Sequence, residues 1–452
     1  MTIDNYMLDR VRQYISRNHL IAANGTYLVA LSGGADSVCL LRMMLSLGYR
    51  VEAVHCNFRL RGEESDRDEQ FCEALCREHG VKLHKVHFDT KEYAALHKVS
   101  IEMAARELRY DYFGQLMQTI GAAGILVAHH RDDSVETVLL NLLRGTGIRG
   151  LEGIKPVNGN VIRPLLCLSR DEILSYLRSC GQDYIVDSSN LVDDVQRNKL
   201  RLNVIPLLKT INPSAIDNIA TTSRHVAEAV KVYDAAMARG ISECLSDDTI
   251  DIPSLYQQSS PEAVLHEILS RYGVPSKLVG QIFDSLLTSP TGSRWQADPY
   301  LIVKDRDTLL IGRQPVDAAP LVMPECGRYV YNGNVNGNGN QTVDVEVRGR
   351  AAIKRISKEP FFATLDADKV QFPLTIRRAQ AGDRFTPFGM RGSKLVSDYL
   401  TDRKRNLFER SRQLVLLDAT GTILWLVGER VADVASVTPD TIKVLCVRYS
   451  KE

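Results

Sequence analysis

The feature of this chain that most constrains its fold is a short loop rich in serine and glycine. Residues 32 to 37 read Ser-Gly-Gly-Ala-Asp-Ser, and they join an apolar run at 26–31 to a helix-like run at 38–44. Two adjacent glycines allow a sharp turn and a close backbone approach to a ligand, and the free amides at a helix start attract anions. The order strand, glycine turn, helix therefore predicts a phosphate-binding loop.

Asp36 narrows the choice of ligand. A carboxylate beside phosphate groups is repulsive unless a divalent cation lies between them. The loop also lacks the Gly-Lys-Ser/Thr of a Walker A loop. We therefore expect a magnesium polyphosphate, and the alternative is a surface turn that happens to be rich in serine and glycine.

Length and patterning predict several domains. The chain has 452 residues and a formal net charge of +1, which neither demands nor excludes a nucleic acid partner. From residue 26 to about 187, apolar runs alternate with helix-length segments, which favours an α/β fold with a doubly wound, mostly parallel sheet. We predict strands at 27–31, 51–55, 83–88 and 125–128.

The chain after about residue 187 has other patterns, and the whole chain divides into three expected domains. We expect a catalytic domain at 1–215, a mainly helical middle domain at 216–345 and a small α+β domain at 346–452, with strands at 422–427 and 442–447. The run 331–340 is rich in asparagine and glycine and predicts a loop or hairpin tip.

Composition also bears on location and on metal chemistry. The first twenty residues carry charges, and nowhere do eighteen consecutive apolar residues occur, so we expect a cytoplasmic protein without a membrane partner. The nine cysteines form no Cys-x-x-Cys pair or zinc-type cluster. Cys72 and Cys76 come closest and are predicted to be buried small hydrophobes.

Two further groups of charged residues suggest chemistry. Glu102, Arg106 and Arg109 share one face of a predicted helix at 101–110, and arginine forks suit phosphate, although an exposed ion pair is the alternative. His130 and the nearby carboxylates of Asp133 and Glu136 open a helix after the fourth predicted strand. A capped helix would need fewer ionisable groups, so we favour a metal, substrate or acid/base cluster.

Taken together, these motifs resemble the tRNA(Ile)-lysidine synthetase family of the N-type ATP pyrophosphatase, or PP-loop, superfamily. The resemblance is closest over about 26–210 and 374–430. It includes the stretches 55–68, 102–110, 130–147, 163–166, 187–190, 197–201, 377–390 and 394–404. The segment 405–410 departs from the family pattern, which usually contains a proline there.

The resemblance implies a fold, a reaction and partners. The first domain would have the adenine nucleotide alpha hydrolase-like fold, and the other two domains would bind tRNA. With ATP and magnesium as cofactors, such enzymes adenylate carbon 2 of the wobble cytidine in the CAU anticodon of a minor isoleucine tRNA. Free lysine then displaces AMP, after pyrophosphate has already left. The implied partners are that tRNA and lysine. The oligomeric state, a homodimer included, stays open.

The resemblance also implies roles for single residues. ATP would be bound by Ser32, Gly33, Gly34, Ala35, Asp36 and Ser37, with Asp36 on magnesium. The catalytic residues would be Asp36, Arg106, Arg109, His130, Asp133 and Glu136, of which the arginines stabilise phosphate charge and the last three position lysine. The tRNA would be bound by Arg197, Arg201, Arg377, Arg378, Arg384, Lys394, Arg403, Lys404 and Arg405.

The local charge of the C-terminal segment supports tRNA binding by the residues named there. Residues 375–412 contain ten arginines or lysines and four acids, a balance of +6, although a solvated charged face is the alternative.

Two rival functions remain open at this stage. Another PP-loop enzyme, for tRNA thiolation or amidotransfer, would share the ATP site, but thiolation needs paired cysteines near that site. A non-catalytic ATP-binding regulator would need few of the carboxylates and arginines found here.

Overall fold

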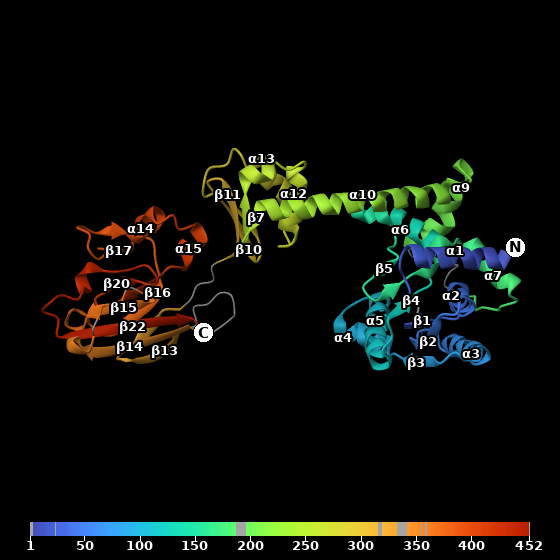
Figure 1. The fold of residues 1–452 in the computed structure, drawn as a ribbon, viewed down its shortest axis with the longest axis horizontal. Coiled ribbons are helices and arrows are strands. Elements are labelled where there is room, and N and C mark those ends of the chain that lie inside the picture. The colour runs from blue at the N-terminus through green and yellow to red at the C-terminus, as the bar shows by residue number, and fades with distance from the viewer. Residues whose placement is uncertain are drawn as a thin grey trace. The chain divides into compact units, whose positions relative to one another are not determined.

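The computed structural model describes residues 3–22, 24–186, 196–314, 319–331, 341–353, 355–357 and 359–451. The chain divides into two compact units, Met1–Asp234 and Ala235–Glu452 (Figure 1). The three-domain division at 215 and 345 stays a prediction.

A six-stranded sheet forms the centre of the first unit, in the order β3-β2-β1-β4-β6-β5. All pairs are parallel except the one between β5 and β6. The strands are β1 (Thr26–Ala30), β2 (Arg50–Asn57), β3 (Leu83–His87), β4 (Gly124–Leu126), β5 (Val157–Asn158) and β6 (Val161–Ile162). The four predicted strands are confirmed. Because the chain turns back from β3 to β4, the switch point of this doubly wound sheet lies between β1 and β4.

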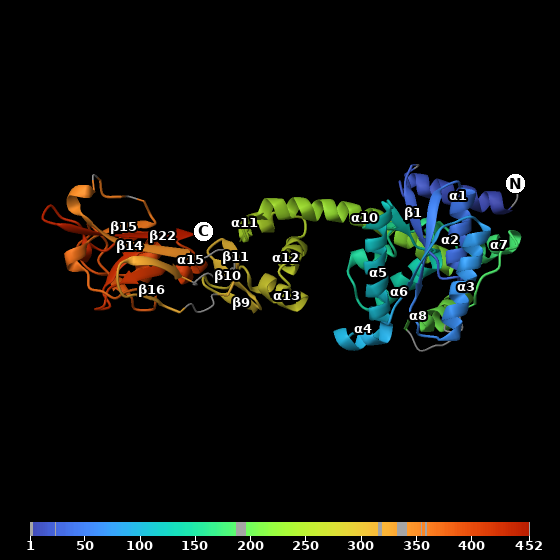
Figure 2. The same ribbon diagram turned by 90° about the horizontal axis from the view of Figure 1, so that it is seen from below.

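Helices cover both faces of this sheet (Figure 2). Tyr27 and Val29 pack among residues of α1 (Ile3–Arg17), α2 (Ala35–Ser46), α3 (Glu63–Glu78) and α7 (Arg170–Ser179). Leu28 packs on the other face, against α5 (Ile101–Ile120), which α4 (Thr90–His97) precedes. Successive strand residues point to opposite faces, so a strand covered on both sides reads as a continuous apolar run. That is why the run before the loop was recognisable.

The last part of the first unit brings a basic segment back to the sheet. It contains α8 (Gln196–Lys199), a π-helical turn at Leu200–Val204, α9 (Ile205–Ile211) and the start of α10 (Ala215–Cys244). Ile205 and Ile216 pack on Val135 of α6 (Arg131–Leu143). This apolar contact holds the segment 197–201 against the helix that carries Asp133 and Glu136.

The second unit begins with helices and a sheet. The helices are α11 (Ile252–Tyr256), α12 (Pro261–Ser270) and α13 (Ser276–Ser285). The sheet has the order β7 (Leu245–Ser246), β8 (Thr249–Asp251), β11 (Thr308–Arg313), β10 (Tyr300–Asp305) and β9 (Arg294–Ala297). The helical character predicted for this region is confirmed, but the strands at 245–251 and 294–313 were not predicted. Among them, β10 and β11 pair as a hairpin in which Ile302 lies opposite Ile311, and β9 pairs antiparallel with the other edge of β10.

The rest of the second unit is rich in strands, as the predicted α+β fold requires. One sheet contains β12 (Leu321–Met323), β16 (Leu374–Arg378), β19 (Leu414–Leu417), β20 (Ile423–Leu426) and β21 (Arg430–Val431). The other contains β13 (Gly327–Tyr331), β14 (Gln341–Gly349), β22 (Lys443–Lys451) and β15 (Phe362–Asp366). A shared apolar core that includes Leu416, Trp425 and Leu445 joins the two sheets. The predicted strands at 422–427 and 442–447 are confirmed.

Smaller elements complete this part: β17 (Arg384–Phe385), β18 (Lys394–Leu395), α14 (Val396–Asp402) and α15 (Leu407–Arg412). Residues 332–340 of the predicted hairpin tip lie outside the described residues, and the strands on either side, β13 and β14, pair antiparallel. The motif at 187–190 also lies outside them. In the part of the chain that the structure describes, no helix is long and apolar enough to cross a membrane.

The turn at Gly33 gives a testable prediction. Gly33 has φ +88°, and a Cβ atom there would lie 2.6 Å from Ile185 Cδ1, whereas Gly48 has φ +80° and open space around it. Both alanine variants impose a strained backbone, but only Gly33→Ala also adds a collision. We expect Gly33→Ala to lower the free energy of unfolding by roughly 1 kcal/mol more than Gly48→Ala in urea titrations. Equal losses would contradict this assignment.

Candidate active site

The predicted phosphate loop leaves β1 and enters α2 at the switch point. Gly34 is the N-cap of α2, and among the residues that the structure describes no side chain accepts a hydrogen bond from the first amides of this helix. Inside the loop, Ser37 Oγ donates to the Gly34 carbonyl at 2.9 Å and accepts from the Ser32 amide at 3.2 Å. Ser37 is buried, and Ser32 is exposed. The turn is therefore fixed from within, while the helix start stays open to an anion.

A pocket of about 650 Å³ opens beside this loop. Its walls come from the carboxyl ends of β1, β2 and β4 and from α5, as expected for a switch point. The pocket is lined by both apolar and polar side chains, and a nucleotide site needs both. The lining includes Ser32, Asp36, Ser37, Val54, Cys56, Phe58, Arg109, Phe113, Val127, His129, Asp133 and Arg197.

The two arginines predicted to meet phosphate differ in position. Arg109 lines the pocket, with its guanidinium carbon 5.0 Å from the centre of the Phe58 ring. Arg106 lies 5.1 Å from the Tyr110 ring centre and outside the pocket lining. Both side chains belong to exposed residues of α5. Their phosphate-binding role stays a prediction.

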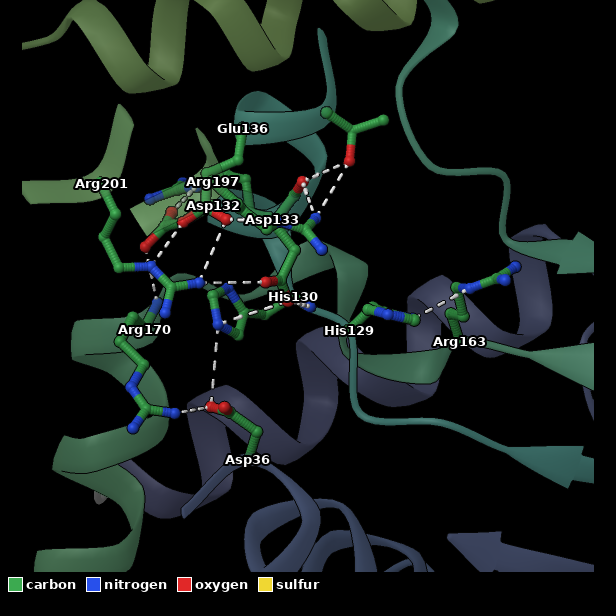
Figure 3. A network of polar contacts seen from close by, with 12 residues as sticks. Asp36, His129, His130, Asp132, Asp133, Glu136, Arg163, Arg170, Arg197 and Arg201 are labelled. Atoms are coloured by element: carbon green, nitrogen blue, oxygen red, sulfur yellow. Dashed lines mark hydrogen bonds and ion pairs between the residues drawn. The ribbon is translucent and has the colours of Figure 1, made fainter. Parts of the chain in front are cut away.

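Asp36 meets a cation that the sequence analysis missed. Its carboxylate pairs with Arg170, the first residue of α7 (Figure 3). The Arg170 amide donates to Asp132 Oδ2 at 3.0 Å, which fixes the start of α7 beside the loop. The Ser169–Glu172 capping box, which marks a helix start shortly after β6, is the sequence signal that could have found it.

His130 and Asp133 lie together and face Asp36. His130 Nε2 is 3.4 Å from Asp133 Oδ2 and 3.8 Å from Asp36 Oδ1 (Figure 3). The His130 amide also donates to Asp133 Oδ2 at 3.0 Å, so the same carboxylate caps α6. His130 Nδ1 is buried and has no hydrogen-bond partner among the described residues. The cluster that the sequence predicted is therefore one physical group, although its role stays a prediction.

Glu136 is enclosed by two arginines. The residue is 1% exposed. Arg197 Nε donates to Glu136 Oε2 at 2.8 Å, and Arg201 donates to both carboxylate oxygens at 2.7 and 3.1 Å. Donation to Glu136 raises the pKa of the Arg201 guanidinium. Both arginines were predicted to bind tRNA, and that role stays a prediction; within the described residues their side chains lie on Glu136.

His129 is the pocket residue that the sequence analysis passed over. It precedes His130, and it lines the pocket. Its Nδ1 accepts a hydrogen bond of 3.1 Å from Arg163 Nε. Burial lowers the pKa of His129 to about 4. Adjacent residues in extended backbone point to opposite sides, so a His-His pair after a strand places one ring toward the pocket and the other toward α6.

The residues fit magnesium that arrives with a polyphosphate. Among the described residues, no group of three histidines, cysteines or carboxylates could hold a metal ion alone. Magnesium in phosphate sites usually takes one or two carboxylates and completes its shell with phosphate oxygens and water. Asp36 supplies one such carboxylate beside the loop, and its pairing with Arg170 shows that it faces a position that accepts positive charge.

The predicted tRNA-binding residues of the second unit are partly paired. Arg377 makes a two-pronged bond to Asp383 at 2.8 and 2.9 Å, Lys394 pairs with Asp402, and Arg384 donates to the Ser393 carbonyl at 3.1 Å. Arg403 lies 5.5 Å from the Tyr399 ring centre. Arg378 lines a separate pocket of about 930 Å³ within this unit. A tRNA-binding role for this set stays a prediction.

The segment that departs from the family pattern has a defined local structure. Lys404 adopts φ +58°. Arg405 then pairs with Glu429 at 2.7 Å and with Glu409 at 3.0 Å. Asn406 and Glu409 form a capping box, which starts α15. A cap therefore starts the helix in this chain, and no proline is needed.

Protein families that match parts of the chain show the class of its first unit. Residues 7–208 match the PP-loop domain family, and residues 246–314 match the TilS substrate binding domain. The first match covers the loop, the parallel sheet and the cluster around Asp36. The first unit is thus a PP-loop domain.

The full chain has close relatives over nearly its whole length. A tRNA(Ile)-lysidine synthase of Bacteroides thetaiotaomicron is 43% identical over 436 residues, which cover 96% of this chain and 98% of the relative. The enzyme of that name from Parabacteroides distasonis is 42% identical and covers 98% and 100%, and the one from Bacillus subtilis is 29% identical and covers 92% of each. The chain belongs to the tRNA(Ile)-lysidine synthase family.

The enclosed carboxylate gives a second prediction. Glu136→Gln removes the charge that two arginines share, and it leaves them facing a neutral amide. We expect the free energy of unfolding in urea to fall by about 2 kcal/mol, less than for a fully buried pair because both arginines are partly exposed. Glu228→Gln, which breaks the exposed pair with Lys231, should cost much less, because solvent screens that pair. Similar losses of unfolding free energy in the two variants would show that Glu136 stabilises the fold no more than an exposed ion pair does.

Proposed function

We propose that this chain ligates lysine to carbon 2 of the wobble cytidine in the CAU anticodon of an isoleucine tRNA, and that ATP is converted to AMP and pyrophosphate. The observation that carries the proposal is the position of the phosphate loop. It lies at the switch point of the sheet, with its helix start uncapped and with Asp36 facing His130 and Asp133. Membership of the tRNA(Ile)-lysidine synthase family supports the same reaction.

The reaction has two bond exchanges. The oxygen on carbon 2 of the cytidine attacks the α-phosphorus of ATP, and the bond to the β-phosphate breaks, so pyrophosphate leaves. The lysine ε-amine then attacks carbon 2, the carbon–oxygen bond breaks, and the oxygen leaves with AMP. The amine must give up a proton during this second step.

In the first step, the loop would hold the leaving group. The uncapped amides of α2 and the hydroxyl of Ser32 suit the pyrophosphate oxygens. Ser37 also lines the pocket, and its hydroxyl would have to leave the Gly34 carbonyl to donate to a phosphate. Asp36 would hold magnesium, which when bound neutralises charge on the leaving group. Arg109, which lines the pocket, would meet phosphate from the α5 side, and Arg106 lies one turn away.

In the second step, Asp133 is the carboxylate best placed to receive lysine. It lines the pocket, whereas Glu136 is covered by Arg197 and Arg201. We infer that Asp133 and His130 orient the ε-amine, and that Glu136 acts by holding the two arginines at the pocket wall. The basic segments at 197–201 and 375–412 would contact the tRNA backbone.

The reaction itself is the third prediction. With ATP and magnesium, release of AMP and sustained release of pyrophosphate should require both lysine and an isoleucine tRNA transcript with a CAU anticodon, and mass analysis of the nucleosides should show lysidine. Asp36→Asn should reduce turnover at least 100-fold and leave tRNA affinity nearly unchanged. Turnover with glutamine or a sulfur donor would favour another PP-loop reaction, and ATP binding without turnover would favour a regulator.

Binding of tRNA by the C-terminal segment is the fourth prediction. Replacing Arg403, Lys404 and Arg405 by glutamine should weaken tRNA binding and reduce the slope of log affinity against log salt by about one for each lost phosphate contact. Filter binding at several salt concentrations measures this slope. Replacing Arg12 and Arg17 of α1 by glutamine is the control, and it should leave the slope unchanged. An unchanged slope in the triple variant would contradict the assignment.

A further inference from the structure

We propose that Arg163 is a positioning residue that fixes His129 as the neutral tautomer protonated on Nε2, so that His129 offers a hydrogen-bond donor to the nucleotide pocket. The use of this donor in catalysis rests on the proposed function. The tautomer itself is a property of the free protein and can be tested alone.

The local geometry determines which atom donates. Arg163 is the residue between β6 and the short 3-10 helix Pro164–Cys167, and it is 7% exposed. Its Nε lies 3.1 Å from His129 Nδ1, and its Nη1 donates to the Lys155 carbonyl at 2.8 Å. A guanidinium has only donors and does not lose its proton in proteins. His129 Nδ1 must therefore be the acceptor, and the proton of the neutral ring lies on Nε2.

The other ring nitrogen is turned to the ligand side. His129 lines the pocket together with Ser32 and Asp133. Within the described ranges, the hydrogen bond from Arg163 is the one contact made by the His129 ring nitrogens. In Figure 3, the Arg163 side chain approaches His129 from the side opposite to Asp36 and Asp133. The Nε2–H group can thus reach an acceptor oxygen of a bound nucleotide.

The electrostatic surroundings keep the ring neutral. Burial is the main cause of the low pKa of His129, about 4. Asp133 on α6 favours the cation, while Arg163, Arg197 and His130 oppose it. A neutral ring whose Nδ1 already accepts a bond has no lone pair for another proton. His129 is therefore a donor and not the base that takes the proton of lysine.

The burial of Arg163 indicates that this side chain has a role beyond packing. Among the residues that the structure describes, it forms no ion pair, and its side chain donates to two neutral acceptors, a ring nitrogen and a carbonyl. Burial lowers the pKa of this guanidinium. Holding a cation in such a place is costly, and a neutral side chain could bind one carbonyl at lower cost. Only a group that is always a donor fixes the tautomer at every working pH.

The direct test is nitrogen-15 NMR of the whole protein with labelled histidine. Long-range proton–nitrogen spectra distinguish the two neutral tautomers and the cation, and His129→Gln assigns the signal. We expect His129 to show the Nε2–H pattern from pH 8 down to about pH 5. An Nδ1–H pattern, or a cation at pH 7, in the unaltered protein would overturn the proposal without any variant.

Two variants test the role of Arg163. In Arg163→Met the ring should populate both tautomers, and its titration midpoint should rise by at least one pH unit. Arg163→Lys, which keeps a cationic donor, should restore part of the Nε2–H population. An unchanged tautomer and midpoint in Arg163→Met would overturn the proposal. Urea unfolding of each variant identifies a folding defect. If a variant is destabilised, the NMR spectrum of the unaltered protein decides between the two tautomers.

Kinetics connect the tautomer to the reaction. In Arg163→Met, kcat for pyrophosphate release should fall at least tenfold at pH 7.5, and the acid limb of the pH profile should move upward, while KM for lysine changes less than twofold. A purely structural role would lower the active fraction without moving the pH profile. Since the NMR result needs no substrate, it stands even if the tRNA reaction fails.

Discussion

The turn at Gly33 and Gly34 is the constraint on which the site depends. Gly34 provides no side chain to cap α2, so the first amides of the helix stay available, and the positive φ of Gly33 lets the chain turn sharply soon after β1 ends at Ala30. A capping side chain at this position would satisfy the amides and remove the anion site. The place of the loop at the switch point then decides which other residues can reach a bound nucleotide.

Charge organises the rest of the pocket. The carboxylates of Asp36, Asp133 and Glu136 come from two helix starts, and arginines from α7, α8 and the following turn meet them. The pairs of Asp133 and Glu136 fix side chains before substrate arrives, which reduces the reorganisation that the reaction must drive. The exchange of Arg170 for a metal ion at Asp36 would be part of binding.

The sequence allowed the sheet, the loop and the cluster of His130 and Asp133 to be predicted, because each depends on local patterns. β1 is apolar on both faces, and the carboxyl ends of parallel strands meet at one edge. Arg170 and Arg163 were not predicted as site residues, since their partners lie 134 and 34 residues away. The strands at 294–313 were missed because a short antiparallel hairpin beside helices leaves only a weak period-two pattern.

The central claim is that the loop after β1 holds the leaving pyrophosphate of ATP. Diffraction from crystals grown with magnesium and a non-hydrolysable ATP analogue tests it most directly. The account predicts the β- and γ-phosphates on the amides of residues 34–37, a metal ion on Asp36, and Arg170 moved off that carboxylate. Phosphates bound elsewhere, with the Asp36–Arg170 pair intact, would contradict it.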